Sequence, residues 1–371
     1  MLASVVVSCG GGDGSTAPKD AAWTEEEVTF SVGPNTLNGI LTLPDSEGPH
    51  SAVVIASGSE SREGSIQSGV TDAYFADLAH RLAGAGYAAF RYDSKGVGSR
   101  GDAGLQTLDA KRDEVIAALR RVRRHSSIRA DEVGLWGISQ EAWTISMAAA
   151  AEPDEVAFII PVSGAGISVA EQQVWGIEAQ SRAAGLQTPD IERATLLGGL
   201  LVDWQLTEPL FHDANEKLVA KLGAGPWQDF FTLVYDSDAL GPAENLSRGI
   251  TILTSIKDEP WAQALHLEEL YLPRLRSVAP EQIEQLKAAS GQSLLIDPRD
   301  SLTRVTSPVL AFFGEDDIVQ PTDRSAKLYA QYLDEAGNDD VTIVILQGVG
   351  HDISPSSPGY WDRLVQWLDE R

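Results

Sequence analysis

The chain is poor in cysteine, in basic residues and in long apolar segments, and each shortage excludes a class of protein. Cys9 is the single cysteine among 371 residues, so we expect neither an internal disulfide nor a metal site built from several cysteines. Lys and Arg number 28 against 54 Asp and Glu, which gives a net charge of −26. A surface this acidic repels nucleic acid and anionic lipid, so we expect neither as a partner. After the N-terminus, no stretch is long and apolar enough to cross a membrane.

What the chain does contain is typical of a globular protein. Apolar residues make up 43% of the sequence and nine are tryptophan, which excludes a disordered chain. A length of 371 residues is large for one compact domain, so we expect a core domain that carries an insertion.

The N-terminus has the features of a bacterial lipoprotein signal. Leu2 to Val7 are apolar, Ser8-Cys9 follows, and a glycine-rich stretch leads to Pro18. Cys9 would be the lipidated residue and residues 1–22 a signal-like segment with a flexible tether, which predicts a periplasmic or membrane-anchored protein. The apolar run is short and no basic residue precedes it. The alternative is a chance match in a cytoplasmic protein.

The rest of the chain alternates between strand and helix patterns. Such alternation, with helices of 10 to 15 residues between strands, predicts a mostly parallel sheet covered on both faces, an α/β fold. A β-hairpin precedes it, with strands expected over 27–30 and 37–43 on either side of Gly33-Pro-Asn35. The expected strands are 51–56, 87–92, 132–136, 155–160, 307–313 and 341–346, and the expected helices are 71–83, 105–123, 140–151, 322–335 and 359–368.

This alternation stops at about Gly164 and resumes near Asp300. The segment between is mostly helical in pattern and rich in tryptophan, with Gly249–Thr254 as its one strand candidate. We therefore predict a sheet core formed by residues 23–164 and 301–371, and a helical insertion over 165–300. An insertion of this size exceeds most functional loops. Its tryptophans are expected to form its own core: Trp175, Trp204, Trp227 and Trp261.

Ser139 lies on a tight turn between a strand and a helix. The apolar run that ends at Trp136 is followed by Gly137-Ile-Ser139-Gln-Glu141 and then by an alanine-rich helix pattern. We call residues 137–141 the Ser139 turn. A serine on such a turn projects its hydroxyl beyond the sheet, beside the first amides of the helix, as acyl-transfer chemistry requires. A plain helix N-cap is the structural alternative.

A serine hydroxyl needs a base to remove its proton and a carboxylate to orient that base. Two later strands end in suitable residues. The first runs into Gly314-Glu-Asp-Asp317, and the second into Gly348-Val-Gly-His351-Asp352. Functional groups in parallel sheets collect at the carboxyl ends of strands. Ser139, Asp317 and His351 are therefore expected to meet, with Asp316 as the alternative acid and Asp352 as a solvated carboxylate.

These motifs in this order resemble the α/β-hydrolase superfamily, over about residues 27–371. Ser139 matches the family's nucleophile, Asp317 its acid and His351 its histidine, and Asp93 of Asp93-Ser-Lys-Gly-Val-Gly-Ser99 matches a structural turn. The resemblance implies a doubly wound, mostly parallel sheet with a helical cap between strands six and seven. It also implies an oxyanion hole from the backbone amides of Gln140 and Ser59, and no metal or organic cofactor.

Glu141 departs from the pattern, because glycine is common at this position in the family. Three interpretations compete. Glu141 points to solvent beside a helix N-terminus, which we favour; it lines a pocket for a cationic or hydroxyl-rich substrate; or the site has lost its activity.

The sequence thus predicts a serine hydrolase that cleaves carboxylic esters of small molecules through an acyl-enzyme. A thioesterase or a peptidase with the same three residues is the alternative enzyme. A non-catalytic binding protein on the same scaffold is the alternative from another class, which the unusual Glu141 leaves open.

Overall fold

The computed structural model describes residues 22–56, 61–62, 65–66, 70, 72–94, 107–236, 240–279 and 282–371. An eight-stranded sheet has the order β1-β2-β6-β3-β7-β8-β9-β10. β2 runs antiparallel to both of its neighbours, β1 and β6, and every other adjacent pair in this sheet is parallel. The strands are β1 (Trp23–Val32), β2 (Asn35–Pro44), β3 (His50–Ala56), β6 (Ala88–Tyr92), β7 (Ile128–Ile138), β8 (Ile159–Val162), β9 (Val309–Gly314) and β10 (Val341–Leu346). The predicted mostly parallel sheet is confirmed.

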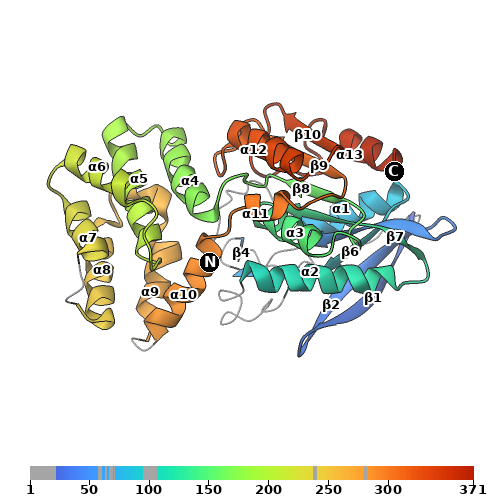
Figure 1. Ribbon diagram of the computed structural model, residues 1–371, viewed down its shortest axis with the longest axis horizontal. Coiled ribbons are helices and arrows are strands. Elements are labelled where there is room, and N and C mark those ends of the chain that lie inside the picture. Colours follow the sequence, from blue (N-terminus) through green and yellow to red (C-terminus); the bar gives the residue numbers. More distant parts are fainter. Residues whose placement is uncertain are drawn as a thin grey trace. The chain divides into compact units, whose positions relative to one another are not determined.

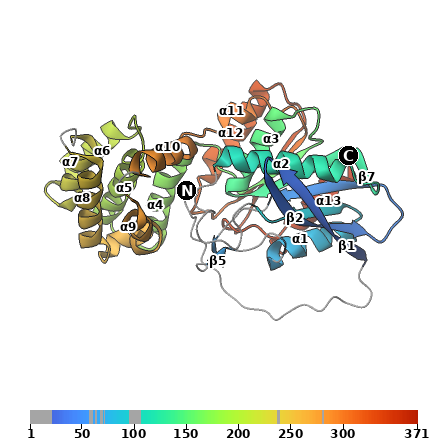
Figure 2. The same cartoon turned by 90° about the horizontal axis from the view of Figure 1, so that it is seen from below.

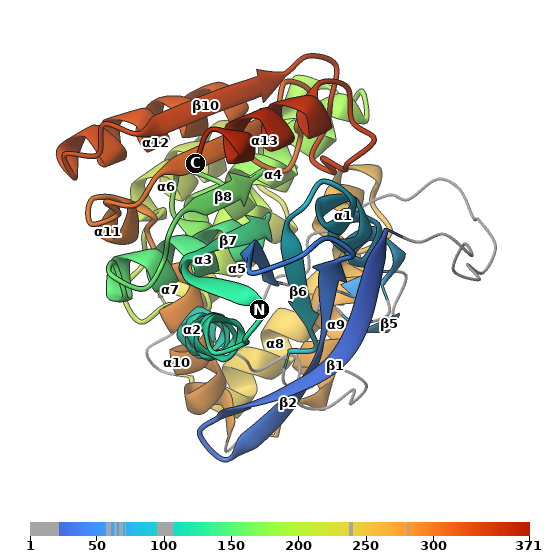
Figure 3. The ribbon, with the colours of Figure 1, turned by 90° about the vertical axis from the view of Figure 1, so that its right-hand side faces the viewer.

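Helices cover both faces of this sheet (Figure 3). One face is covered by α2 (Leu108–Arg123), α3 (Gln140–Ala151), α11 (Arg299–Leu302) and α12 (Thr322–Glu335), and the other by α1 (Ala73–Gly84) and α13 (Tyr360–Asp369). Successive residues of β3 alternate between the two cores: Val54 packs with the first group and Val53 with the second. This alternation follows from the two-residue period of a strand.

The expected hairpin is present and is longer than predicted. β1 and β2 pair along their whole length, from Trp23 opposite Pro44 to Val32 opposite Asn35, with Gly33 at a φ of 54° in the turn (Figure 2). A separate two-stranded sheet joins β4 (Ser61–Arg62) and β5 (Ser65–Ile66).

Between β8 and β9, the sixth and seventh strands of the sheet in chain order, lies a helical insertion (Figure 1). It forms a compact unit of residues Ser168–Ile296, to which Ile318–Pro321 also belong. Its elements are α4 (Val169–Ala183), α5 (Thr188–Asp203), α6 (His212–Leu222), α7 (Pro226–Tyr235), α8 (Pro242–Ile256), a 3₁₀ helix (Pro260–Leu265), a π-helical turn (Leu267–Tyr271), α9 (Leu272–Ser277) and α10 (Ile283–Leu294).

The core of this unit contains Trp204, Trp227 and Trp261, whereas Trp175 is only half-buried. The two ends of the segment 168–296 lie side by side, because the amide of Val169 donates to the carbonyl of Ile296 at 3.0 Å.

The strand candidate Gly249–Thr254 is wrong, because these residues lie within α8. Their β-branched side chains suggested a strand. The buried residues of α8, however, are Gly249, Leu253 and Ile256, and this spacing of four and three is that of one helix face. Pro242 in the first turn of α8 fits a helix start.

The predicted strand 155–160 also differs from the structure, since β8 begins at Ile159 and continues through Pro161 to Val162. Across the described ranges, none of the helices combines the length and the apolar character that a bilayer crossing needs.

Candidate active site

The Ser139 turn joins the middle of the sheet to α3. β7 ends at Ile138 and α3 begins at Gln140, so Ser139 is the single residue between them. Its backbone has a φ of 56° and a ψ of −120°, a conformation that costs a non-glycine residue about 1–3 kcal/mol. Two backbone bonds hold it there: Ser139 donates to the carbonyl of Val162 at 2.8 Å, and the amide of Ala142 donates to Ser139 at 3.1 Å.

Gly137 is required by the close passage of backbone within this turn. A Cβ added at residue 137 would lie 2.6 Å from the carbonyl oxygen of Glu141 and 3.0 Å from the Cβ of Glu141. The space that Gly137 leaves is therefore what admits a side chain at position 141.

Three side chains from separate strand ends form one hydrogen-bonded chain. Nε2 of His351 lies 2.9 Å from Oγ of Ser139, and Nδ1 of His351 lies 2.8 Å from Oδ2 of Asp317. An ionised carboxylate can only accept hydrogen bonds, so Nδ1 carries the proton and donates to Asp317. Nε2 is then free to accept from the hydroxyl of Ser139. The predicted meeting of these three residues is what the structure shows.

Burial differs along this chain. The side chain of Asp317 is 0% exposed and that of His351 is 8% exposed, whereas Ser139 is half-buried. Asp316, the alternative acid, is exposed, as is Asp352. The carboxylate that contacts His351 is thus shielded from water more completely than the serine at the other end of the chain of hydrogen bonds.

Gly314 lets the loops that carry Asp317 and His351 run against each other. A Cβ at residue 314 would lie 2.2 Å from the carbonyl oxygen of Gly350. Backbone bonds join the same two loops, from Glu315 to Leu346 and from Asp316 to Val349, each at 2.9 Å.

Ser163 supports the histidine from the end of β8. Its side chain is buried, and its hydroxyl donates to the backbone carbonyl of His351 at 2.7 Å. Its backbone φ is 48°, again in the left-handed region. Sequence reasoning missed Ser163, because a serine in Ser163-Gly-Ala-Gly has no local pattern that distinguishes it from an ordinary loop residue.

The favoured interpretation of Glu141, a side chain pointing to solvent, is wrong. Glu141 is buried, and its Oε1 lies 2.6 Å from Nζ of Lys111, which is buried as well. Lys111 also donates to Oε1 of Gln140 at 2.9 Å. Lys111 was another residue that sequence reasoning missed. A signal existed, since Lys111 occupies the apolar face of α2 together with Leu108, Val115 and Ala118.

Of the remaining predicted site residues, two lie among the described residues and two do not. Gln140 opens α3, and its amide is among those that helix geometry leaves without a backbone acceptor. Asp93 accepts a hydrogen bond from the amide of Val70 at 3.0 Å, in line with a structural turn. Ser59 and Cys9 lie outside the described residues.

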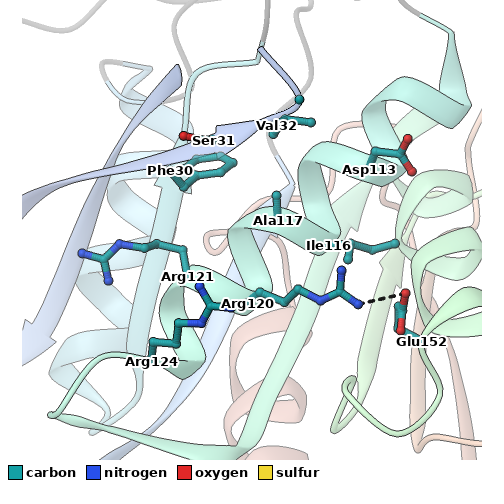
Figure 4. A pocket seen from close by; sticks show the side chains of 11 residues that line it. Phe30, Ser31, Val32, Asp113, Ile116, Ala117, Arg120, Arg121, Arg124 and Glu152 are labelled. Carbon is teal, nitrogen blue, oxygen red and sulfur yellow. Dashed lines mark ion pairs between the residues drawn. The ribbon is translucent and has the colours of Figure 1, made fainter. Parts of the chain in front are cut away.

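A cavity of about 550 Å³ lies elsewhere in the sheet unit, between the β1–β2 hairpin and α2 (Figure 4). Phe30, Arg121 and Arg124 are among its lining residues, and in it Arg120 pairs with Glu152 at 3.0 Å. Neither Ser139, His351 nor Asp317 lines this cavity, so it is separate from the hydrogen-bonded chain.

The family model for X-Pro dipeptidyl-peptidase (S15 family) matches residues 21–197. No curated protein matches the sequence.

Solved structures match over nearly the whole chain. The α/β hydrolase GrgF from Penicillium sp. sh18 is 17% identical with a TM-score of 0.52, covering 93% of this chain and 97% of that one. The esterase Pf2001 of Pyrococcus furiosus is 13% identical with a TM-score of 0.53, covering 100% and 97%. Dipeptidyl peptidase 4 of Porphyromonas gingivalis is 14% identical with a TM-score of 0.50, covering 94% of this chain, which spans only 36% of that protein. The sheet order and these structures together show that the chain has the α/β-hydrolase fold.

Proposed function

We propose that this protein is a serine hydrolase that cleaves carboxylic esters through an acyl-enzyme. The observation that carries the proposal is the continuous chain from the Ser139 hydroxyl through His351 to Asp317, with contacts of 2.9 and 2.8 Å. Such a chain activates a hydroxyl that is otherwise protonated and weakly nucleophilic at neutral pH.

In the first half-reaction, Oγ of Ser139 attacks the ester carbonyl carbon while Nε2 of His351 takes the hydroxyl proton. The carbonyl oxygen becomes an oxyanion, which accepts hydrogen bonds from the amide of Gln140 and, by the family resemblance, from that of Ser59. The tetrahedral intermediate then collapses. The bond to the leaving alcohol breaks, and His351 returns the proton to the alcohol oxygen.

In the second half-reaction, His351 deprotonates a water molecule that attacks the acyl carbon. Collapse of this second intermediate releases the carboxylic acid and restores the proton to Ser139. Asp317 keeps the imidazole proton on Nδ1 and stabilises the imidazolium that forms in each half. Burial of Asp317 suits this role, because an electrostatic interaction is stronger where water is excluded.

Labelling and turnover test the proposal directly. We expect a fluorophosphonate probe to label the wild type at Ser139, and Ser139→Ala to abolish the labelling. Ser139→Ala and His351→Ala should each lower kcat for p-nitrophenyl acetate by about 10⁴-fold or more. Circular dichroism should show an unchanged fold. An unlabelled wild type would favour the non-catalytic binding protein, and near-full activity in His351→Ala would remove His351 as the base.

Peptide cleavage is the second candidate, and the match of residues 21–197 to the S15 model favours it. The same side chains serve both reactions, since the two differ in leaving group and in substrate contacts. Comparing kcat/KM for p-nitrophenyl esters of increasing acyl length with kcat/KM for X-Pro p-nitroanilides separates them. A kcat/KM higher for the anilides would replace the ester proposal, and a matched series of acyl thioesters tests the thioesterase alternative.

We also propose that Cys9 is lipidated and that this lipid attaches the protein to a membrane. Metabolic labelling with an alkynyl palmitate in a bacterial host should mark the wild type. Labelling that persists in Cys9→Ser would exclude Cys9 as the modified residue.

A further inference from the structure

One buried ammonium contacts the side chains of both residues that follow Ser139. Nζ of Lys111 lies 2.9 Å from Oε1 of Gln140 and 2.6 Å from Oε1 of Glu141. Lys111 and Glu141 are each 3% exposed. A contact between α2 and the start of α3 therefore holds the Ser139 turn in addition to its backbone bond with β8.

Stability alone is a poor explanation for this ion pair. Removing two charges from water is costly, and well-packed apolar side chains of similar volume often serve at least as well. Glu141 moreover occupies a position where a plain glycine would need no partner. The pair is therefore better explained by what it does to the turn.

The turn needs such support, because Ser139 has a backbone conformation that L-residues rarely adopt. Conformations of this kind persist only where the surroundings fix them from several directions. The amide that would hold the oxyanion belongs to Gln140. The hydrogen bond from Lys111 to the Gln140 side chain thus acts on the residue whose backbone amide must point at the oxyanion.

Charge gives a second reason. Glu141 lies in the first turn of α3, the end of the helix where the proposed oxyanion forms. A bare carboxylate there would oppose the developing negative charge. The charge of Glu141 also acts on Tyr92 of β6. Burial, the charge of Glu114 and the charge of Glu141, in decreasing order, raise the pKa of the Tyr92 phenol well above its usual value. Lys111 is the cation that contacts Glu141 directly among the described residues.

We propose that Lys111 is a positioning residue of this hydrolase: its ammonium ties Gln140 and Glu141 together, aims the Gln140 amide at the oxyanion and neutralises the Glu141 carboxylate. This inference rests on the proposed function, since it concerns the turnover that Ser139 supports.

The main test is the neutral double variant Lys111→Met/Glu141→Gln, which removes both charges at nearly constant volume and so leaves no unpaired buried ion. We expect kcat for p-nitrophenyl acetate to fall tenfold to a hundredfold, with KM within about threefold. The expected loss is part of the 10²–10³-fold that complete removal of an oxyanion donor costs. Rates are measured per fluorophosphonate-titrated site and well below the melting temperature, so a purely structural role would not change them.

Single variants complete the design. Gln140→Ala keeps the amide and the ion pair but removes the tether, and should lower kcat several-fold without unfolding the chain. Arg120→Met is the matched control on α2, because Arg120 pairs with Glu152 and Glu155 and does not contact the turn.

The two failures are distinguishable. A wild type that does not react with the fluorophosphonate contradicts the proposed function itself. A wild type that reacts, together with a wild-type kcat in either Lys111→Met/Glu141→Gln or Gln140→Ala, overturns the positioning role and leaves Lys111 as a structural counter-ion.

Discussion

At the scale of single residues, the site depends on side chains that form hydrogen bonds with the backbone of Ser139, Asp317 or His351. Ser163 is the clearest case, because its hydroxyl bonds to the carbonyl of His351 rather than to the imidazole. It therefore fixes where the histidine loop lies without taking part in proton transfer.

Removing this hydroxyl should weaken activity more than stability. In Ser163→Ala the carbonyl of His351 loses a buried partner, and we expect kcat/KM for p-nitrophenyl acetate to fall about tenfold, equivalent to about 1.4 kcal/mol. Ser301→Ala is the control, since Ser301 is buried and donates to a carbonyl of its own segment, that of Pro298. Equal effects of the two substitutions on kcat/KM would contradict a specific role for Ser163.

A second prediction concerns His50, a buried residue at the start of β3. Burial lowers its pKa below the ordinary value of 6.5, and the charge of Arg129 acts in the same direction, against a hydrogen bond with the backbone of Ser46 that raises it. As the pH falls through 6.5, His50 becomes protonated in the unfolded chain, whereas in the folded chain it stays neutral until a lower pH. The free energy of unfolding should therefore decrease, by at most about 1.4 kcal/mol per pH unit.

Urea unfolding of the wild type and of His50→Asn between pH 7.5 and 5 checks this expectation. The variant should have the shallower pH dependence, because it no longer carries the group that titrates. Parallel curves would mean that His50 contributes nothing to the pH dependence of stability.

The residue scale is also where the sequence was most and least informative. Asp317 could be predicted ahead of Asp316 because family spacing favoured it. The burial of Glu141 could not, because its partner Lys111 is 30 residues earlier and on another helix. A charge on an apolar helix face indicates that some partner exists, but a single sequence does not identify it.

At the scale of elements, the crossing of two loops decides whether Asp317 and His351 meet. Gly314 ends β9, and its missing side chain lets the loop after β9 pass the loop after β10. We expect Gly314→Ala to separate these loops, because the new Cβ would start 2.2 Å from the carbonyl of Gly350 and neither backbone can yield cheaply.

Turnover of p-nitrophenyl acetate should fall about a hundredfold or more in Gly314→Ala, since small misplacements of reacting groups cost about this much. Gly84→Ala is the matched control: a Cβ at residue 84, the last of α1, would meet nothing within 4 Å. Full activity in Gly314→Ala would show that the close approach is not needed.

Element boundaries were predictable where apolar periodicity and helix signals agreed. The predicted ranges of α3, α12 and β10 coincide with the observed Gln140–Ala151, Thr322–Glu335 and Val341–Leu346. Prediction failed in α8, where β-branched residues suggested a strand and burial along one helix face prevailed. Local propensity is the weaker influence wherever tertiary packing selects the face.

At the scale of the whole molecule, the dominant property is a net charge of −26. Like charges crowd together when the chain folds, and this repulsion opposes the compact state. Dissolved salt weakens this repulsion, because at 0.1 M the interaction between exposed charges more than about 10 Å apart is largely screened.

The melting temperature should therefore rise by a few degrees between 0.02 and 0.5 M NaCl, a change that corresponds to roughly 1–2 kcal/mol for a chain of this size. Calorimetry at fixed pH measures it, and KCl should give the same result as NaCl if screening is the cause. A falling melting temperature would mean that ion pairs such as Arg120–Glu155 outweigh the repulsion.

The hydrogen bond between Val169 and Ile296 has a consequence for how such a protein can diversify. Because the helical segment leaves and rejoins the remainder of the chain at a single spot, its length can change with little additional closure entropy. Whole segments of different ancestry could be grafted between these two residues while the strand order stays the same. Chimeras joined at Val169 and Ile296 would exchange the helical unit while leaving the sheet and the residues Ser139, Asp317 and His351 unchanged.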